Sequence, residues 1–134
     1  TRGALIYLDL DGFKAVNDRY GHQQGDDLLV ALTQALTSRL RRTDFLARIG
    51  GDEFAVLVEG IPNDQDPVDL ASEINSLVHE VAAALLPSDA APVGASAGVA
   101  FFGGEPIGLE ALLKRADAAM YCAKDSGRGH VCVE

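Results

Sequence analysis

The stretch FLARIGGDEFAVLV, from Phe45 to Val58, consists of two short apolar runs separated by Gly50, Gly51, Asp52 and Glu53. Two strand-length runs joined by a glycine-containing turn predict a β-hairpin. The paired glycines carry no side chains, so a ligand could approach their backbone closely. Hairpin turns also use glycine and aspartate for purely structural reasons. By itself, therefore, this stretch is informative about the fold and says little about function.

Apolar patterns on both sides of the hairpin predict the other elements. Before it we expect a buried strand over 4–10, a short helix over 13–20 that Gly21 ends, and a longer helix after Gly25 and Asp26. After it we expect a helix from Pro67 to Leu85, a strand over 93–102, an amphipathic helix over 109–126 and a short edge strand over 130–133. Apart from the extra helix and the final strand, this is the βαββαβ order of a ferredoxin-like α+β sheet. We expect the helices to cover one face of a largely antiparallel sheet.

The length and net charge of the chain limit the classes of function that it can have. The chain has 134 residues, enough for one core and one domain over 1–134, and its formal net charge is -9. That charge argues against a nucleic-acid polymer as partner, but it is compatible with a polyphosphate bound through metal ions. No apolar run has the length of a membrane span, so we expect no membrane contact by this domain. Cys122 and Cys132 have neither a disulfide framework nor metal-ligand spacing, which favours a reducing cytoplasm.

Two pairs of acidic residues end predicted strands. Strand alternation places Asp9 and Asp11 on one side and Leu10 on the other. If that strand lies beside the hairpin, both carboxylates approach Asp52 and Glu53. Carboxylates crowded together repel one another unless a cation is present, and oxygen ligands suit Mg²⁺. Either pair alone could be a turn, whereas both together indicate a metal site. His22, His79 and His130 have no ligand spacing, and we assign none of them to metal.

Five motifs in order resemble the GGDEF family of diguanylate cyclases over nearly the whole chain. The motifs are residues 48–54 (RIGGDEF), 9–18 (DLDGFKAVND), 20–26 (YGHQQGD), 96–100 (SAGVA) and the run from Arg115 to Arg128. The resemblance implies a fold of the nucleotide-cyclase or palm type. It also implies condensation of two GTP molecules into cyclic di-GMP, with two Mg²⁺ or Mn²⁺ ions per active site. Family domains usually begin with a further helix, and we expect this chain to be a fragment of a longer protein.

The same resemblance implies roles for individual residues. Asp9, Asp52 and the Leu10 carbonyl would hold metal, and Glu53 would be catalytic with Asp9 and Asp52. GTP would be bound by Phe13, Lys14, Asn17, Asp26, Gly50, Gly51, Lys124 and Arg128. Spacing alone favours structural roles for four of these residues, since Asp26 suits a helix N-cap, Asn17 suits the end of a short helix, and Lys124 and Arg128 suit a helix C-terminus. Arg41 and Asp44 resemble the RxxD site at which cyclic di-GMP inhibits the family.

The resemblance implies a homodimer, because each domain holds one GTP. It further implies attached sensory or EAL-type domains and a location in the cytoplasm, alone or as the cytoplasmic part of a membrane-anchored bacterial protein. One alternative is a non-catalytic regulatory domain that binds GTP or cyclic di-GMP, although such relatives usually have a damaged Gly-Gly-Asp-Glu-Phe stretch. Another alternative is a palm-like nucleotidyl transferase that acts on ATP or a polynucleotide. The acidic charge counts against a polynucleotide, and the implied roles of Asn17 and Asp26 favour guanine over adenine.

Overall fold

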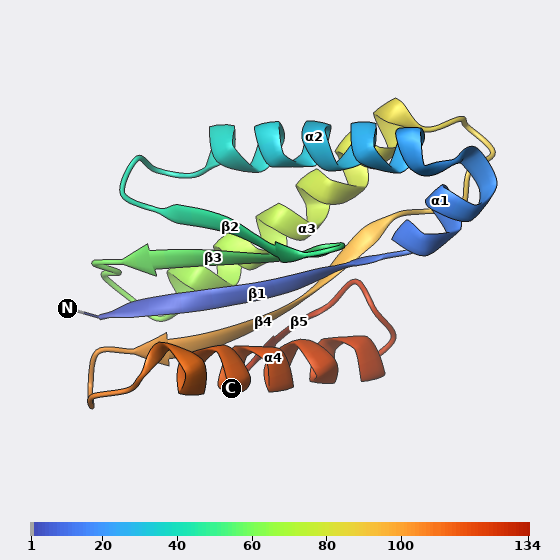
Figure 1. The fold of residues 1–134 in the computed structure, drawn as a ribbon. Coiled ribbons are helices and arrows are strands. Elements are labelled where there is room, and N and C mark those ends of the chain that lie inside the picture. Colours follow the sequence, from blue (N-terminus) through green and yellow to red (C-terminus); the bar gives the residue numbers. More distant parts are fainter. Residues whose placement is uncertain (1) are drawn as a thin grey trace.

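The computed structural model describes residues 2–134 and shows helices packed on both sides of a twisted sheet (Figure 1). In chain order the elements of these residues are β1 (Gly3–Asp11), α1 (Phe13–Tyr20), α2 (His22–Arg39), β2 (Phe45–Gly50), β3 (Glu53–Glu59), α3 (Gln65–Leu85), β4 (Gly94–Phe102), α4 (Leu109–Asp125) and β5 (Val131–Val133). The predicted order, including the extra helix and the short final strand, is confirmed.

The sheet has the strand order β2-β3-β1-β4-β5. Its pairs are antiparallel except for β4 and β5, which are parallel. The central strand β1 lies between β3 and β4, and its residues from Ala4 to Leu8 are buried. An apolar run without polar alternation is typical of a strand covered on both faces.

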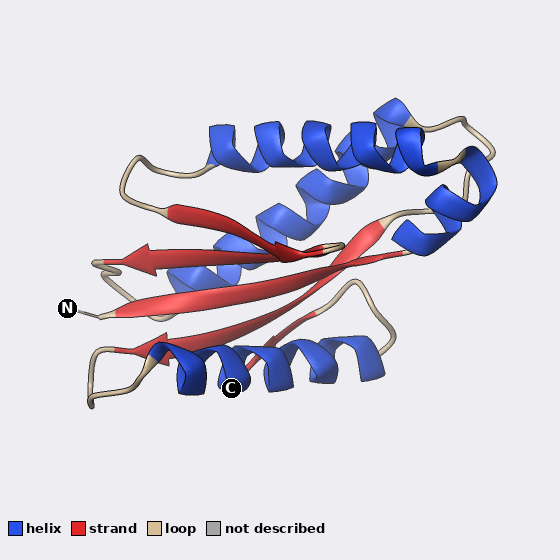
Figure 2. Ribbon diagram, viewed as in Figure 1, coloured by secondary structure: helices blue, strands red, loops and turns tan. Residues whose placement is uncertain are grey.

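The helices divide between the two faces of the sheet (Figure 2). Ile6, Leu8 and Leu10 of β1 belong to the core formed with α1, α2 and α3. Leu5 and Tyr7 point the other way and pack with Leu112, Ala116 and Met120 of α4. The expectation that the helices cover one face is therefore wrong. The reason is that β1 is apolar on both sides, and the face left by the first three helices needs the apolar stripe of α4 to exclude water.

Gly98 of β4 sets how closely α4 approaches the sheet. A Cβ atom at this position would lie 2.3 Å from the Ala116 carbonyl oxygen and 2.2 Å from the Met120 nitrogen. The backbone of α4 thus rests on the backbone of β4, as only glycine permits. This contact fixes the helix whose charged side chains reach the end of β1.

Two helices begin earlier than the sequence predicts. Helix α2 begins at His22, so Asp26 lies inside it and is not its N-cap. Helix α3 begins at Gln65 and not at Pro67, because the Asn63 side chain accepts hydrogen bonds from the Gln65 and Asp66 backbone nitrogens at 2.9 and 3.1 Å. No helix within residues 2–134 is long and apolar enough to cross a membrane.

Candidate active site

The carboxylates of β1 and of the hairpin meet at one end of the sheet. Asp9 is the cross-strand partner of Glu53, and the Leu10 nitrogen donates a hydrogen bond of 3.0 Å to the Asp52 carbonyl oxygen. Directly opposite residues of neighbouring strands share a face, so Asp9 and Glu53 both point toward α4. The structure thus brings together the two acidic pairs that the sequence analysis singled out.

The hairpin turn that carries Asp52 is tight, and a hydrogen bond from the Arg48 side chain stabilises it. The pairing is shifted between Arg48 and Gly50, which leaves Ile49 as a bulge. Gly51 has a φ of 50°, a left-handed conformation that favours glycine. The Arg48 Nε atom donates to the Gly51 carbonyl oxygen at 2.9 Å. A Cβ atom at Gly50 or Gly51 would meet nothing within 4 Å, so the space beside both glycines is open to a ligand.

Helix α4 and the loop after it place two cations on these carboxylates. The Lys124 Nζ atom lies 2.9 Å from Asp9 Oδ2 and 3.3 Å from Asp11 Oδ1, and Arg128 Nη1 lies 3.4 Å from Asp11 Oδ1. Burial lowers the pKa of Lys124, but its hydrogen bond to Asp9 and the charges of Asp9 and Asp11 outweigh that effect, so the net pKa is raised. Lys124 is therefore a fixed positive charge facing the acids.

Asp11 has partners that the sequence analysis did not foresee. Its Oδ2 atom accepts hydrogen bonds from the Ser96 hydroxyl at 2.7 Å and from the Gly129 backbone nitrogen at 3.1 Å. Asp11 is buried, and Ser96 is fully so. The carboxylate thereby joins β1, β4 and the loop after α4, and it holds that loop against the site.

Tyr7 and Asp117 complete the acidic cluster, and neither was among the residues predicted for the site. The Tyr7 hydroxyl donates to Glu53 Oε2 at 2.6 Å, and burial, followed by this hydrogen bond, raises the Tyr7 pKa well above its usual value of 10.0. Burial, followed by the charges of Glu53 and Asp9, raises the pKa of Asp117. Two signals were available: strand alternation puts Tyr7 on the face of Asp9, and Asp117 lies two helical turns before Lys124.

Two features of the cluster are compatible with a bound divalent cation. Asp9 Oδ1 is buried without a hydrogen-bond partner. Burial, and next the negative charge of Asp9, raises the pKa of Asp52. Both observations describe negative charge that a cation would stabilise. Within residues 2–134 no three His, Cys, Asp or Glu side chains form a metal-binding group. The predicted ligands are two carboxylates and the Leu10 carbonyl, which is compatible with a shell that substrate phosphates complete.

Four of the predicted nucleotide contacts lie on α1 and in the first half of α2. Gly12, with a φ of 86°, turns the chain from β1 into α1, and Phe13 is buried at the start of that helix. Asn17 packs so closely on α2 that a Cβ atom at Gly25 would lie 1.9 Å from its Oδ1 atom. Asp26 follows on α2 and is exposed. Lys14 is also exposed, and it pairs with Asp18 at 2.9 Å and not with the acidic cluster.

The Arg41–Asp44 pair lies at the other end of β2, in the turn that follows α2. The Arg41 backbone nitrogen donates to Asp44 Oδ2 at 2.9 Å, and its Nη2 atom donates to Asp44 Oδ1 at 3.0 Å and to the Glu59 carbonyl oxygen at 3.1 Å. Only 3% of the Asp44 side chain is exposed. A hollow of about 390 Å³ lies beside this pair, with Arg42 and Arg48 also in its lining.

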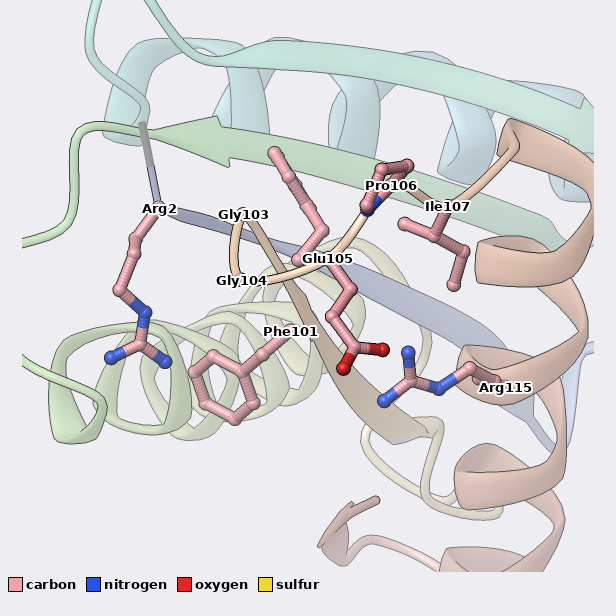
Figure 3. A pocket seen from close by; sticks show the side chains of 9 residues that line it. Arg2, Phe101, Gly103, Gly104, Glu105, Pro106, Ile107 and Arg115 are labelled. Atoms are coloured by element: carbon pink, nitrogen blue, oxygen red, sulfur yellow. The ribbon is translucent and has the colours of Figure 1, made fainter.

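Another hollow, of about 380 Å³, lies away from the acidic cluster (Figure 3). It is lined by Arg2, Arg115 and the segment 101–107, at the end of the sheet where Gly3 pairs with Phe102. Asp11 pairs with Gly94 at the opposite end of the same two strands. No predicted site residue lines this hollow.

Comparison with known proteins places this geometry in a family. Residues 1–130 match the family model described as diguanylate cyclase, GGDEF domain. The bifunctional diguanylate cyclase/cyclic di-GMP phosphodiesterase MucR of Pseudomonas aeruginosa is 40% identical over 132 residues, which are 98% of this chain and 19% of MucR. The diguanylate cyclase TpbB of the same species is 38% identical over 94% of this chain and 29% of its own length. The chain therefore spans 19% of one of these relatives and 29% of the other.

Solved structures agree with that placement. The active GGEEF domain of a diguanylate cyclase from Vibrio cholerae superposes with a TM-score of 0.87 at 28% identity, covering 99% of this chain and 83% of that one. The GGDEF domain of DgcB from Caulobacter crescentus, solved in complex with c-di-GMP, has a TM-score of 0.71 at 28% identity and covers 99% and 78% of the two chains.

Proposed function

The chain belongs to the GGDEF family of diguanylate cyclase domains, and from that premise we propose that it condenses two GTP molecules into cyclic di-GMP and pyrophosphate. One observation carries the proposal. The carboxylates of Asp9, Asp52 and Glu53 converge from β1 and the β2–β3 hairpin, and Lys124 faces them from α4 at 2.9 Å from Asp9. Acids gathered beside a fixed cation suit the binding and activation of a triphosphate.

Asp9, Asp52 and the Leu10 carbonyl would hold two Mg²⁺ or Mn²⁺ ions, which when bound polarise the α-phosphate and lower the pKa of the attacking hydroxyl. Glu53 would accept the proton of the 3′ hydroxyl of one GTP as it attacks the α-phosphate of the other. Lys124 and Arg128 would bind the terminal phosphates. Gly50 and Gly51 present an open backbone beside the turn, which supports close approach of the nucleotide.

Asn17 and Asp26 would select guanine by hydrogen bonding to its edge, with Phe13 and Lys14 at the phosphate side of α1. For Lys14 this requires exchange of its partner Asp18 for a phosphate. Cyclic di-GMP would bind as inhibitor at Arg41 and Asp44, beside the hollow in which Arg48 also lies. Because each copy would hold one GTP, two copies must face each other. The full-length protein would carry attached sensory or EAL-type domains. This domain would lie in the bacterial cytoplasm, either in a cytoplasmic protein or as the cytoplasmic part of a membrane-anchored one.

The test is to fuse the chain to a dimeric coiled coil, incubate it with GTP and Mg²⁺, and measure cyclic di-GMP by chromatography. The fusion should form product, and Asp52→Asn should lower the rate by at least roughly 10²-fold, the usual scale for a group that stabilises transition-state charge. Asp69→Asn, an exposed change of the same chemistry on α3, is the matched control and should leave the rate unchanged. Product formation by Asp52→Asn at the rate of the control would refute the assignment.

A non-catalytic regulatory domain is the alternative function. It predicts that the fused chain binds GTP or cyclic di-GMP and forms no product. The intact Gly50–Phe54 stretch and the full set of converging carboxylates favour the enzyme. Titration calorimetry on the same fusion separates the two functions, because binding without turnover would support the regulatory domain.

A further inference from the structure

Two free cysteines face each other beside the proposed phosphate-binding loop. Cys122 lies in the last turn of α4 and Cys132 lies in β5, and their Sγ atoms are 2.9 Å apart. A disulfide has an S–S distance of about 2.05 Å, so the two sulfur atoms need to move together by only about 0.9 Å. The segment between them, residues 123–131, includes Lys124, Arg128 and Gly129, which contact Asp9 and Asp11.

The ends of this segment are held in place without the help of a disulfide. The Ser126 hydroxyl donates to the Cys122 carbonyl oxygen at 2.8 Å. The His130 carbonyl oxygen accepts hydrogen bonds from the Ala97 backbone nitrogen at 3.0 Å and from Asn75 at 3.3 Å. Between these anchors, Gly127, Arg128 and Gly129 all have positive φ values, of 110°, 62° and 67°. The thiols are thus brought together by a defined turn and by the parallel pairing of β5 with β4.

We propose that Cys122 and Cys132 form a reversible dithiol–disulfide pair that is oxidised by peroxide and controls the mobility of the loop 123–131. Cys122 is exposed and would react first. Its thiolate attacks the O–O bond, which breaks to give a sulfenic acid and hydroxide. The Cys132 sulfur then attacks the sulfenic sulfur, the S–S bond forms, and hydroxide leaves. The two hydroxide ions take up the two thiol protons and leave as water. Overall, two thiols and one hydrogen peroxide give one disulfide and two waters, and the two sulfur atoms supply the two electrons that reduce the peroxide.

The protonation of Cys132 fits this order of events. Its hydrogen bond to Cys122, followed by burial, raises the pKa of Cys132. Cys132 therefore remains a thiol that donates to the Cys122 sulfur during the first step. The hydroxide released in that step would take its proton, and the resulting Cys132 thiolate is the nucleophile of the second step. Among residues 2–134 no hydrogen bond joins either cysteine to the acidic cluster, so the pair is chemically separate from the proposed catalytic groups.

Closing the disulfide would restrict the movement of Lys124. Its ammonium group contacts both Asp9 and Asp11. To bind a phosphate it must leave at least one of these carboxylates. The disulfide would close residues 122–132, with Lys124 among them, into a covalent ring. We expect the oxidised chain to bind nucleotide more weakly, by roughly tenfold if one charge-assisted contact is lost. This effect rests on the proposed function, whereas formation of the disulfide does not.

The experiment compares the chain, reduced with dithiothreitol, with the same chain treated with hydrogen peroxide. Mass spectrometry should show the loss of two hydrogen atoms from a monomer, and the melting temperature should rise by roughly 5–10 °C because the cross-link constrains the unfolded chain. Affinity for 3′-deoxy-GTP with Mg²⁺, which lacks the attacking hydroxyl, should fall on oxidation and recover on reduction. Cys132→Ser and Cys122→Ser should show none of these three changes.

Each result decides one part of the inference. If peroxide produces no monomeric disulfide, or a cross-linked dimer in its place, the pair is not the proposed switch. If the disulfide forms and the affinity for 3′-deoxy-GTP is unchanged, its control over the loop is refuted. If neither form binds the nucleotide, the proposed function and the coupling fail together, while mass and melting temperature still decide the disulfide.

Discussion

Tyr7 determines how the Glu53 carboxylate is presented. The hydroxyl donates to one carboxylate oxygen at 2.6 Å, and the raised pKa of Tyr7 keeps it a donor. This hydrogen bond fixes the orientation of the carboxylate, and with it the position of the Oε1 atom. A group that accepts a proton in a reaction needs such a fixed position. Tyr7 would act through Glu53, and we assign it as a positioning residue.

Tyr7→Phe should lower kcat by roughly tenfold and leave KM for GTP unchanged, because a hydrogen bond to a charged group is lost while the ring still packs against α4. Steady-state kinetics of the coiled-coil fusion would measure both constants. Tyr121→Phe is the matched control, since that ring is 61% exposed on α4. A Tyr7→Phe variant with normal kcat, or one whose loss lies entirely in KM, would contradict the assignment.

At the scale of elements, the turn between α2 and β2 presents the Arg41–Asp44 pair. The Asp44 nitrogen donates to the Arg41 carbonyl oxygen at 3.0 Å, and Arg41 also reaches the Glu59 carbonyl oxygen. The turn is therefore joined to the end of β3. A fixed guanidinium beside a buried carboxylate suits the recognition of a phosphate and a guanine edge.

Arg41→Ala should weaken binding of cyclic di-GMP at least roughly tenfold, since one forked, charge-assisted contact is lost. It should also relieve product inhibition without changing KM for GTP. Calorimetric titration with cyclic di-GMP measures the first effect and progress curves measure the second. Arg19→Ala, which breaks a distant exposed pair with Asp89, is the control. An unchanged isotherm for Arg41→Ala would place the inhibitor elsewhere.

Sequence patterns predicted the elements better than their placement. The runs of β1 and the hairpin were sufficient to predict the sheet, and they bring Asp9 beside Glu53. The side of the sheet on which α4 packs could not be predicted, because β1 is apolar in both directions. Tyr7 was missed for the same reason, since in the sequence it is one more member of a buried run. The start of α2 was missed because Gly25 resembles a helix boundary, although its role is to admit Asn17.

At the scale of the whole molecule, the proposed substrate and inhibitor sites lie at opposite ends of β2. The strand runs from Phe45, next to Asp44, to Gly50, next to the turn that carries Asp52. Six residues of strand span about 20 Å. The net charge of -9 makes two copies repel each other, and bound cations would offset this repulsion only in part.

The untethered chain should therefore be mostly monomeric, with a low activity that rises as the square of its concentration. Fusion to the coiled coil should raise the rate sharply by increasing the effective concentration of the second copy. Initial rates against enzyme concentration at saturating GTP test this, with sedimentation to determine the oligomeric state. A strictly linear dependence from a proven monomer would mean that one copy suffices, and the two-domain mechanism would fail.

The contact between Gly98 and α4 has a consequence for how this domain can change over time. The distance between β4 and α4 determines how well Leu112 and Met120 are buried. The same distance determines whether Lys124 contacts Asp9. A larger side chain between β4 and α4 would move α4 away from the sheet. It would thereby disturb the Lys124–Asp9 ion pair, although neither of these two residues is changed. A substitution on the inner face of α4 would therefore change the packing of this layer and the geometry of the proposed site together.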